Sequence, residues 1–300
     1  MKVRYGERTI PYPLHLLTGK LQLCGISESH VAEVLQKIRI EYANTTPTPQ
    51  ELNLFVSNAL LGQSPLIQDN FLTLTRYEEL RNRDPGVLPL ILVLEGSSAT
   101  GKSMLTLPLI HQLGSTRIIG SDSVRQVLRT YFSREEYPEL FSHTYQAYRY
   151  RQSGPEELDS VVRGFLAQVQ LIEPTLKRSI ERYLYEGTMA IIEGVHVIPG
   201  SIQSMGNSVL ELLIHPSIDL HHDMFTLKQE ASGLKTVSSE MDIREKEFQD
   251  TRSIQDYMYN QASQNGIPII EFSDYESALI EISEIIIERI THLIELHARR

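Results

Sequence analysis

Residues 96–103, GSSATGKS, combine glycine, lysine and serine at the spacing of a phosphate-binding loop. Gly96 and Gly101 allow the backbone to turn its N–H groups inward without a clash from Cβ atoms. These N–H groups, with the first turn of a following helix, form a nest for an anion. In this pattern Lys102 reaches the outer phosphates of a nucleotide, and the Ser103 hydroxyl coordinates Mg²⁺. The stretch therefore predicts a site for a nucleoside triphosphate.

The alternative for the same stretch is a plain turn between a strand and a helix. Its surroundings favour the phosphate site, because the apolar run before it is typical of a buried strand and a helix can follow it. Binding alone leaves open whether the phosphate goes to water, to a protein switch or to a metabolite. The expected nucleotide contacts are Gly96, Ser97, Ser98, Ala99, Thr100, Gly101, Lys102, Ser103 and Met104.

Asp122 lies where the next strand-like run ends, at the sheet edge that should also carry the phosphate loop. A carboxylate there can accept the proton of an attacking hydroxyl or hold the metal ion. It can equally be a helix N-cap, a common use of aspartate, and the two roles are compatible. Arg125 follows three residues later, so both side chains can face one cleft. The alternative for Arg125 is a solvated surface position.

Glu193 follows an apolar run and precedes Gly194. This position suits the second carboxylate that organises the metal in phosphate-loop enzymes. The alternative is a residue that marks the exit of the strand into solvent. Ser103, Asp122 and Glu193 are accordingly the predicted Mg²⁺ ligands. His196 is a weaker candidate, because a single histidine after a valine is more often structural than catalytic.

The elements that must position these residues begin at residue 87, where strand-like runs alternate with helical segments. The runs are LPLILVLE, TRIIGS, MAIIEG, SVLELLIH and GIPIIEF. Continuous apolar runs are typical of a parallel sheet covered on both faces, whose ligands bind at the carboxyl ends of the strands. The predicted fold class is α/β, a P-loop NTPase with a parallel sheet flanked by helices.

The first 86 residues follow a different pattern. Two short strands around Gly6 predict a hairpin. Apolar residues at helical spacing predict helices at 14–24, 28–44, 51–61 and near 73–83. Proline and glycine in RNRDPGV predict a boundary near residue 86. We therefore expect a small, mostly helical domain at 1–86 and a phosphate-loop domain at 87–300.

The composition excludes several classes of protein. The net charge of −10 argues against a general nucleic-acid binder, whose affinity comes from neutralising phosphates. The single cysteine, Cys24, can form no internal disulfide and suits a reducing cytosol, so a cytoplasmic protein is expected. No signal peptide is visible, and the longest apolar run is too short to span a bilayer, so no membrane partner is expected. A homo-oligomer is compatible with the sequence.

Residues 88 to 290 resemble the archaeal 2-phosphoglycerate kinase family. Besides the loop, the likeness includes GSDSVRQVLR, HTYQAY, IIEGVHVIPG and RSIQDYMYNQASQNGIPIIE. It implies a nucleoside-monophosphate-kinase-like fold that uses ATP and Mg²⁺ and passes the γ-phosphate to a small phosphorylated acid such as 2-phosphoglycerate. The expected catalytic residues are Lys102, Asp122, Glu193 and Arg125. The expected acceptor contacts are Arg125, His143, His196 and Arg252.

The N-terminal 86 residues resemble an ATP-cone, a small regulatory nucleotide-binding domain. The likeness is carried by KVRYGERTIPYP and the spaced leucines that follow it. It implies a second nucleotide site in this part of the chain. The alternative is a small helical appendage that packs or dimerises.

The segment after the fourth strand departs from what the resemblance implies. In such kinases it is a lid rich in arginine, which clamps the phosphates and neutralises developing charge. Here Met224 and Lys228 stand where the family has arginine, and lysine lacks the bidentate fork of arginine. The remaining cations of the segment are Lys235, Arg244, Lys246 and Arg252. An altered substrate, a slower kinase and a nucleotide-binding protein without phosphotransfer all fit this change.

Two functions from different classes therefore stay open. One is a small-molecule kinase, favoured by the intact Lys102, Ser103, Asp122 and Glu193. The other is a nucleotide-binding regulator with little or no phosphotransfer, favoured by the lid. A nucleic-acid end kinase is disfavoured by the acidic charge and by the lack of aromatic and basic clusters.

Overall fold

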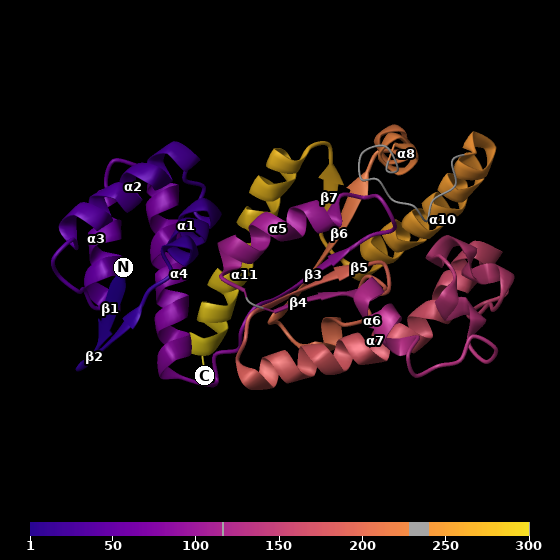
Figure 1. Cartoon of the computed structure of the whole chain (residues 1–300), viewed down its shortest axis with the longest axis horizontal. Coiled ribbons are helices and arrows are strands. Elements are labelled where there is room, and N and C mark those ends of the chain that lie inside the picture. The colour runs from indigo at the N-terminus through magenta and orange to yellow at the C-terminus, as the bar shows by residue number, and fades with distance from the viewer. Residues whose placement is uncertain (116, 228–239, 300) are drawn as a thin grey trace. The chain divides into compact units, whose positions relative to one another are not determined.

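The computed structural model describes residues 1–115, 117–227 and 240–299 (Figure 1). The chain forms two compact units, and each is described by itself. One comprises Met1–Pro89, Leu107–Thr116 and Leu279–Arg300, and the other comprises Leu90–Thr106 and Arg117–Ala278. The domain boundary near residue 86 remains a prediction. No helix of the described residues is long and apolar enough to cross a membrane.

The unit that contains the N-terminus begins with the predicted hairpin, in which β1 and β2 pair antiparallel. Its elements are β1 (Lys2–Tyr5), β2 (Arg8–Pro11), α1 (Leu14–Leu23), α2 (Glu28–Glu41), α3 (Pro49–Ala59) and α4 (Pro65–Arg83). Thr48 starts α3 through a capping box with Glu51, which satisfies N–H groups that the first turn leaves unpaired. The predicted helices are confirmed, although α4 begins well before residue 73, at Pro65, behind the capping hydroxyl of Ser64.

The other unit is built on a five-stranded sheet in the order β4-β5-β3-β6-β7, with every neighbouring pair parallel. The strands are β3 (Ile91–Glu95), β4 (Arg117–Gly120), β5 (Ala190–Gly194), β6 (Val209–Pro216) and β7 (Ile269–Phe272). All residues of β3 and β6 are buried, as expected for mainly apolar strands at the centre of a parallel sheet. The chain runs from the central β3 out to β4, returns to β5 and then crosses to β6. The strand order thus reverses beside β3, where ligands of such sheets bind.

α-Helices follow β3, β4, β6 and β7 in the chain, whereas β5 leads to β6 through the short 3₁₀ turn η3 (Gln203–Met205). The helices are α5 (Lys102–Leu113), α6 (Ser121–Leu128), α7 (Ser160–Glu186), α8 (Ile218–Thr226), α10 (Met241–Asn265) and α11 (Tyr275–Ala298), with further short 3₁₀ turns η1 (Pro138–Phe141) and η2 (Thr144–Arg149). The long α7 lies along one face of the sheet (Figure 1). Its Ile172, Leu176 and Ile180 are fully buried in a cluster with residues of β3 and β5.

A second apolar cluster joins α7, α8, α10 and η2. It contains Phe225 and Phe248, and Tyr145 meets the edge of the Phe225 ring at a centroid distance of 5.9 Å. Gly164 of α7 lies so close to η2 that a Cβ there would sit 2.1 Å from the backbone nitrogen of Tyr148. This close approach fixes the segment that begins at His143.

Candidate active site

A pocket of about 150 Å³ lies at the carboxyl ends of β3 and β5. It brings together most of the residues predicted from separate stretches of the sequence. Its lining residues are Ser97, Ser98, Ala99, Lys102, Ser103, Asp122, Arg125, His143, Thr144, Tyr145, Glu193, Gly194, Val195, Thr251 and Ile254. Because this is the edge where the strand order reverses, the pocket has the position expected of a ligand site.

The phosphate loop leaves β3 at Gly96, which has a φ of 145°. Ala99 has a φ of 64° and is the non-glycine residue with positive φ among the described residues, so the backbone is held in an unusual conformation there. The Lys102 ammonium donates to the Ser97 carbonyl at 2.5 Å and to Oγ1 of Thr100 at 3.0 Å. The cation thus lies across the loop, where the phosphates of a nucleotide would meet it.

Two oxygen ligands suited to Mg²⁺ meet beside the loop. The Ser103 hydroxyl donates to Oε2 of Glu193 at 3.1 Å. The register of the sheet explains this contact, because Glu193 pairs with Leu94 on the neighbouring strand. The described residues hold no group of three or more His, Cys, Asp or Glu side chains that could bind a metal on their own. Such a sparse donor set fits Mg²⁺, which keeps several waters and takes further ligands from substrate phosphates.

Asp122 lies in the first turn of α6 with its side chain 70% exposed. It is not the N-cap, because α6 begins behind Gly120 and has no side-chain cap. Its Oδ1 is 3.0 Å from a terminal nitrogen of Arg125. This carboxylate therefore faces the pocket beside a fixed positive charge.

Arg125 is buried in the pocket wall, with a side chain that is 11% exposed. Its second terminal nitrogen donates to the Ser142 carbonyl at 2.9 Å. Nε of the same guanidinium is buried and has no hydrogen-bond partner among the described residues. Together with His143, Thr144 and Tyr145 it forms a surface that we call the acceptor wall.

His196 is fully buried behind this wall and is not one of the lining residues. Gln168 donates from its amide nitrogen to the Glu139 carbonyl, so its oxygen faces Nε2 of His196 at 3.0 Å. Nε2 must then carry the ring proton, and Nδ1 accepts from the Ser121 hydroxyl at 2.9 Å. Burial lowers the pKa of His196 to about 3, so the ring stays neutral and braces α6 from behind.

The other predicted residues lie outside the pocket lining. Met104 is exposed on α5, and Arg252 donates to the Pro216 carbonyl at 3.1 Å and to Asp256 at 2.8 Å. Gly96, Thr100 and Gly101 shape the loop without facing the pocket. Arg244 packs over the Phe225 ring with its guanidinium carbon 4.0 Å from the centroid.

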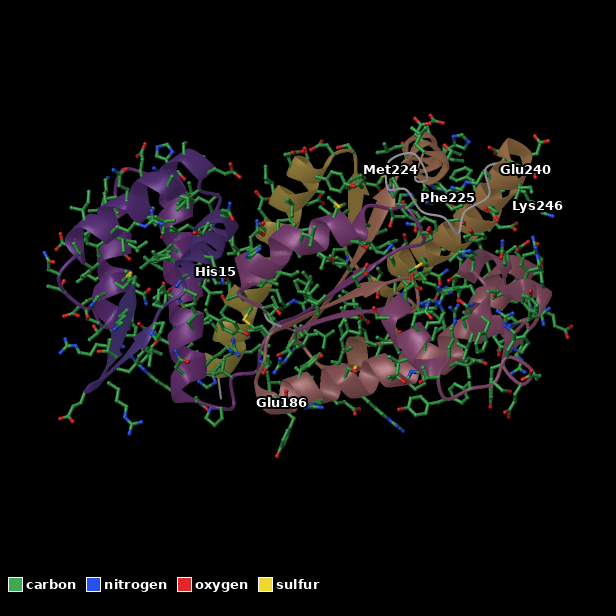
Figure 2. All side chains as sticks on the ribbon, in the orientation of Figure 1. His15, Glu186, Met224, Phe225, Glu240 and Lys246 are labelled. Carbon is green, nitrogen blue, oxygen red and sulfur yellow. The ribbon has the colours of Figure 1, made fainter. Side chains whose placement is uncertain are left out.

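Of the remaining lid positions, Met224 lies on α8 and Lys246 is exposed near the start of α10 (Figure 2). Lys228 and Lys235 lie outside the described residues. Arg244 is buried and donates to Glu247 at 3.2 Å and to the Phe225 carbonyl. The two arginines that the sequence retains in this region are thus both engaged with protein groups.

Sequence reasoning did not single out Gln255 and His221, which contact the phosphate loop from α10 and α8. It also did not single out Thr144 and Tyr145, although His143 beside them was predicted. The stretch HTYQAY could have identified the latter pair, because one turn of chain presents consecutive residues to the same pocket. Gln255 lies within the RSIQDY stretch but carries no chemistry that would mark it.

The fold and the site define a nucleotide-dependent phosphotransferase of the P-loop kinase class. No family model matches the chain. The chain is 28% identical over 242 residues to the 2-phosphoglycerate kinase of Methanothermobacter thermautotrophicus, and this alignment covers 78% of this chain and 76% of the relative. It is 31% identical over 212 residues to the enzyme of the same name from Methanococcus maripaludis, with 68% and 66% covered. The corresponding protein of Thermococcus kodakarensis is 26% identical over 282 residues, with 92% and 93% covered.

These similarities extend over most of the chain, and the chain belongs to the 2-phosphoglycerate kinase family. Among solved structures, shikimate kinase from Acinetobacter baumannii superposes with a TM-score of 0.40 at 13% identity, covering 71% of this chain and 96% of that one. That overlap is too loose for a comparison of sites.

Proposed function

We propose that the protein transfers the γ-phosphate of ATP to 2-phosphoglycerate, with Mg²⁺ as the metal cofactor. The observation that carries the proposal is the convergence of Lys102, Ser103, Asp122, Arg125 and Glu193 on one pocket. The names of the relatives support the choice of acceptor. A phosphate loop supplies the nucleotide side of the reaction, and the acceptor wall supplies a buried guanidinium for an anionic partner.

On the nucleotide side, the backbone N–H groups of the loop would cradle the phosphates. Lys102 would exchange its contacts with Ser97 and Thr100 for the outer phosphate oxygens. Ser103 and Glu193 would hold Mg²⁺ together with water and phosphate oxygens, and the ion would neutralise charge that develops on those oxygens.

On the acceptor side, Asp122 would take the proton of the acceptor hydroxyl as its oxygen attacks the γ-phosphorus. The new bond forms between that oxygen and phosphorus, and the bond from phosphorus to the β–γ bridging oxygen breaks. ADP leaves with the bridging oxygen, and the proton stays on Asp122 until product release. Asp122 suits this task because its exposed carboxylate lies in the pocket, oriented by Arg125 at 3.0 Å.

Arg125 would bind an anionic group of the acceptor. Its unpaired Nε donor leaves the buried guanidinium short of one acceptor oxygen, and a carboxylate or phosphate could supply it. His143 stacks on Tyr145 at a centroid distance of 5.2 Å with the rings nearly parallel. This stacking gives the wall a fixed surface next to the guanidinium.

A nucleotide-binding regulator with little phosphotransfer is the second candidate. One observation favours it: Arg244 and Arg252, the arginines on α10, are engaged with protein carbonyl and carboxylate groups. Neither is available in this arrangement to clamp the phosphates during transfer.

The deciding experiment measures ADP release by the purified protein with Mg²⁺ and ATP, alone and with a panel of acceptors. The panel contains 2-phosphoglycerate, 3-phosphoglycerate, glycerate and glycerol 2-phosphate, and the product is identified by ³¹P NMR. Turnover that requires 2-phosphoglycerate and yields a bisphosphorylated acid supports the kinase. Tight nucleotide binding without any acceptor-dependent turnover would favour the regulator instead.

A further inference from the structure

We propose that Gln255 is a positioning residue that sets the entry of the phosphate loop, and that Arg252 supports Gln255 rather than the acceptor. This inference rests on nucleotide binding by the loop, which is part of the proposed function, but not on the identity of the acceptor. It concerns residues of α8, α10 and β6 that lie outside the pocket lining.

The amide of Gln255 joins the phosphate loop to the sheet. Gln255 is fully buried, and its Oε1 accepts from the Ser97 backbone N–H at 2.8 Å. Its Nε2 donates to the Ile214 carbonyl at 3.0 Å, close to the end of β6. Nε2 also lies 3.2 Å from Nδ1 of His215. Because the Ser97 group is a backbone donor and the Ile214 group a backbone acceptor, the amide has only one satisfactory orientation. A carboxylate at this position could accept from Ser97 but could not donate to Ile214.

This contact determines which N–H groups of the loop remain for a nucleotide. The Ser97 N–H is used by Gln255, and the Ser97 carbonyl accepts from Lys102. Both sides of that residue are therefore fixed by protein groups before any phosphate arrives. The later N–H groups of the loop can then point inward as an anion nest, with no need to reorganise on binding.

His221 provides a second, independent contact from another helix. It lies on α8, is fully buried, and its Nε2 donates to the Ser98 carbonyl at 2.8 Å. Burial lowers the pKa of His221 to about 4, so the ring is neutral at physiological pH. Since a carbonyl can only accept, the single ring proton of His221 must be on Nε2. Two consecutive residues of the loop, Ser97 and Ser98, are thus each held by a neutral buried side chain.

Arg252 fixes the helix that carries Gln255. It lies three residues before Gln255 on α10 and donates to the Pro216 carbonyl, at the end of the strand that Gln255 also contacts. Its Nε donates to Asp256 at 2.8 Å. The guanidinium therefore ties α10 to β6 within one turn of Gln255. These contacts account for the half-buried Arg252 without assigning it a substrate.

The test compares Gln255→Glu and Gln255→Met with the control Gln264→Met, at an exposed position of the same helix. ADP affinity is measured by calorimetry, which needs no acceptor, and Michaelis constants are measured for ATP and for the acceptor. We expect both Gln255 variants to bind ADP about tenfold more weakly and to raise the KM for ATP by a similar factor. The KM for the acceptor should stay within about twofold of the parent value, as should every constant of the control.

Two results with the Gln255 variants would overturn the inference: unchanged ADP affinity in both, or equal rises in the KM for ATP and the KM for the acceptor. An Arg252→Ala variant that raises only the KM for the acceptor would also overturn it. If the Gln255 variants fail to fold, His221→Leu must weaken ADP binding in their place, and His221→Gln, which retains an N–H donor, must weaken it less. If 2-phosphoglycerate proves not to be the acceptor, this inference is still tested, because calorimetry measures the affinity of the phosphate loop for ADP without any acceptor.

Discussion

The phosphate loop is one stretch of chain, residues 96–103, whereas the acceptor wall of the same pocket combines side chains from α6 and from the segment at η2. Helices α8 and α10 hold the loop through Gln255 and His221, each contacting backbone. The wall is instead held through side chains, with His196 linking Ser121, Thr144 and Gln168. A backbone-held loop suits a ligand that many enzymes share, and a wall of side chains can be changed one residue at a time. We expect mutations in the two regions to affect different substrates.

Lys102→Ala should have the largest effect, because it removes the cation that meets the outer phosphates. We expect kcat/KM for ATP to fall by about 10³-fold or more. The ammonium donates to two atoms of the loop itself, the Ser97 carbonyl and Oγ1 of Thr100, so the melting temperature without nucleotide should change little. Turnover and thermal melting are measured side by side, and the control is Lys246→Ala, at an exposed position of α10. Undiminished turnover would show that this loop is not the active nucleotide site.

Asp122→Asn tests the boundary between the two regions. The substitution keeps the size of the side chain and removes its basicity, so kcat should fall about 10²–10³-fold. Asp122 is not the N-cap of α6 and its side chain is 70% exposed, so stability should be nearly unchanged. ATP affinity should also change little, because the loop contacts remain. Rapid-quench or steady-state turnover gives kcat, and calorimetry gives the affinity. A variant that loses ATP affinity but not kcat would assign Asp122 to the nucleotide side as a metal ligand.

Much of the nucleotide side could be predicted from the sequence, because its determinants are contiguous. The loop, the strand before it and the helix after it lie within residues 91–113, and the buried runs of β3 to β7 determine the sheet. Asp122 and Glu193 could be predicted because Asp122 follows the end of β4 and Glu193 lies near the end of β5, and parallel strands bring their carboxyl ends to one edge.

The supports of the site could not be predicted in the same way. Gln255 lies 158 residues from Ser97, and His221 lies 123 residues from Ser98, so no local pattern joins them. The contacts of Arg252 could not be predicted from local spacing either. An arginine on the helix after the lid was expected to face the acceptor, but its partners are Pro216 and Asp256. Only the packing of α10 against β6 reveals which way that side chain points.

Arg125→Ala should sharpen the comparison by weakening the use of the acceptor without changing the binding of ATP. Loss of a charge-assisted contact costs about 1.5–3 kcal/mol, so the acceptor KM should rise roughly 10- to 150-fold while the KM for ATP stays constant. Arg125 also braces the Ser142 carbonyl, so Arg125→Lys is needed as a second variant that keeps the charge. Lysine lacks the fork that reaches Asp122 and Ser142 together, and it should restore only part of the loss. Equal KM values for the acceptor in all three proteins would exclude Arg125 from the acceptor site.

The smallest expected effect concerns the base of the loop, where Glu95 ends β3 directly before Gly96. Its side chain is fully buried, and burial together with the negative charge of Glu211 raises its pKa well above the usual value. The folded state thus favours the protonated form. The contribution of Glu95 to stability is complete below the pKa of the unfolded chain, about 4.3, and is lost as pH rises toward the raised folded-state pKa.

Glu95→Gln removes the loss of stability that Glu95 causes at high pH, because the amide is neutral at every pH. We expect the variant to melt higher than the parent at pH 8, by roughly 2–4 °C if about 1 kcal/mol is recovered, and the difference to narrow as pH falls toward 5. Melting curves across this range decide the point, with Glu135→Gln at an exposed position as the control. A pH-independent difference would mean that the variant acts through packing and that Glu95 carries no titration cost. If the difference in melting temperature narrows as pH falls, ionisation of the buried Glu95 carboxyl destabilises the protein at high pH, and a carboxyl group at this position is not required for stability.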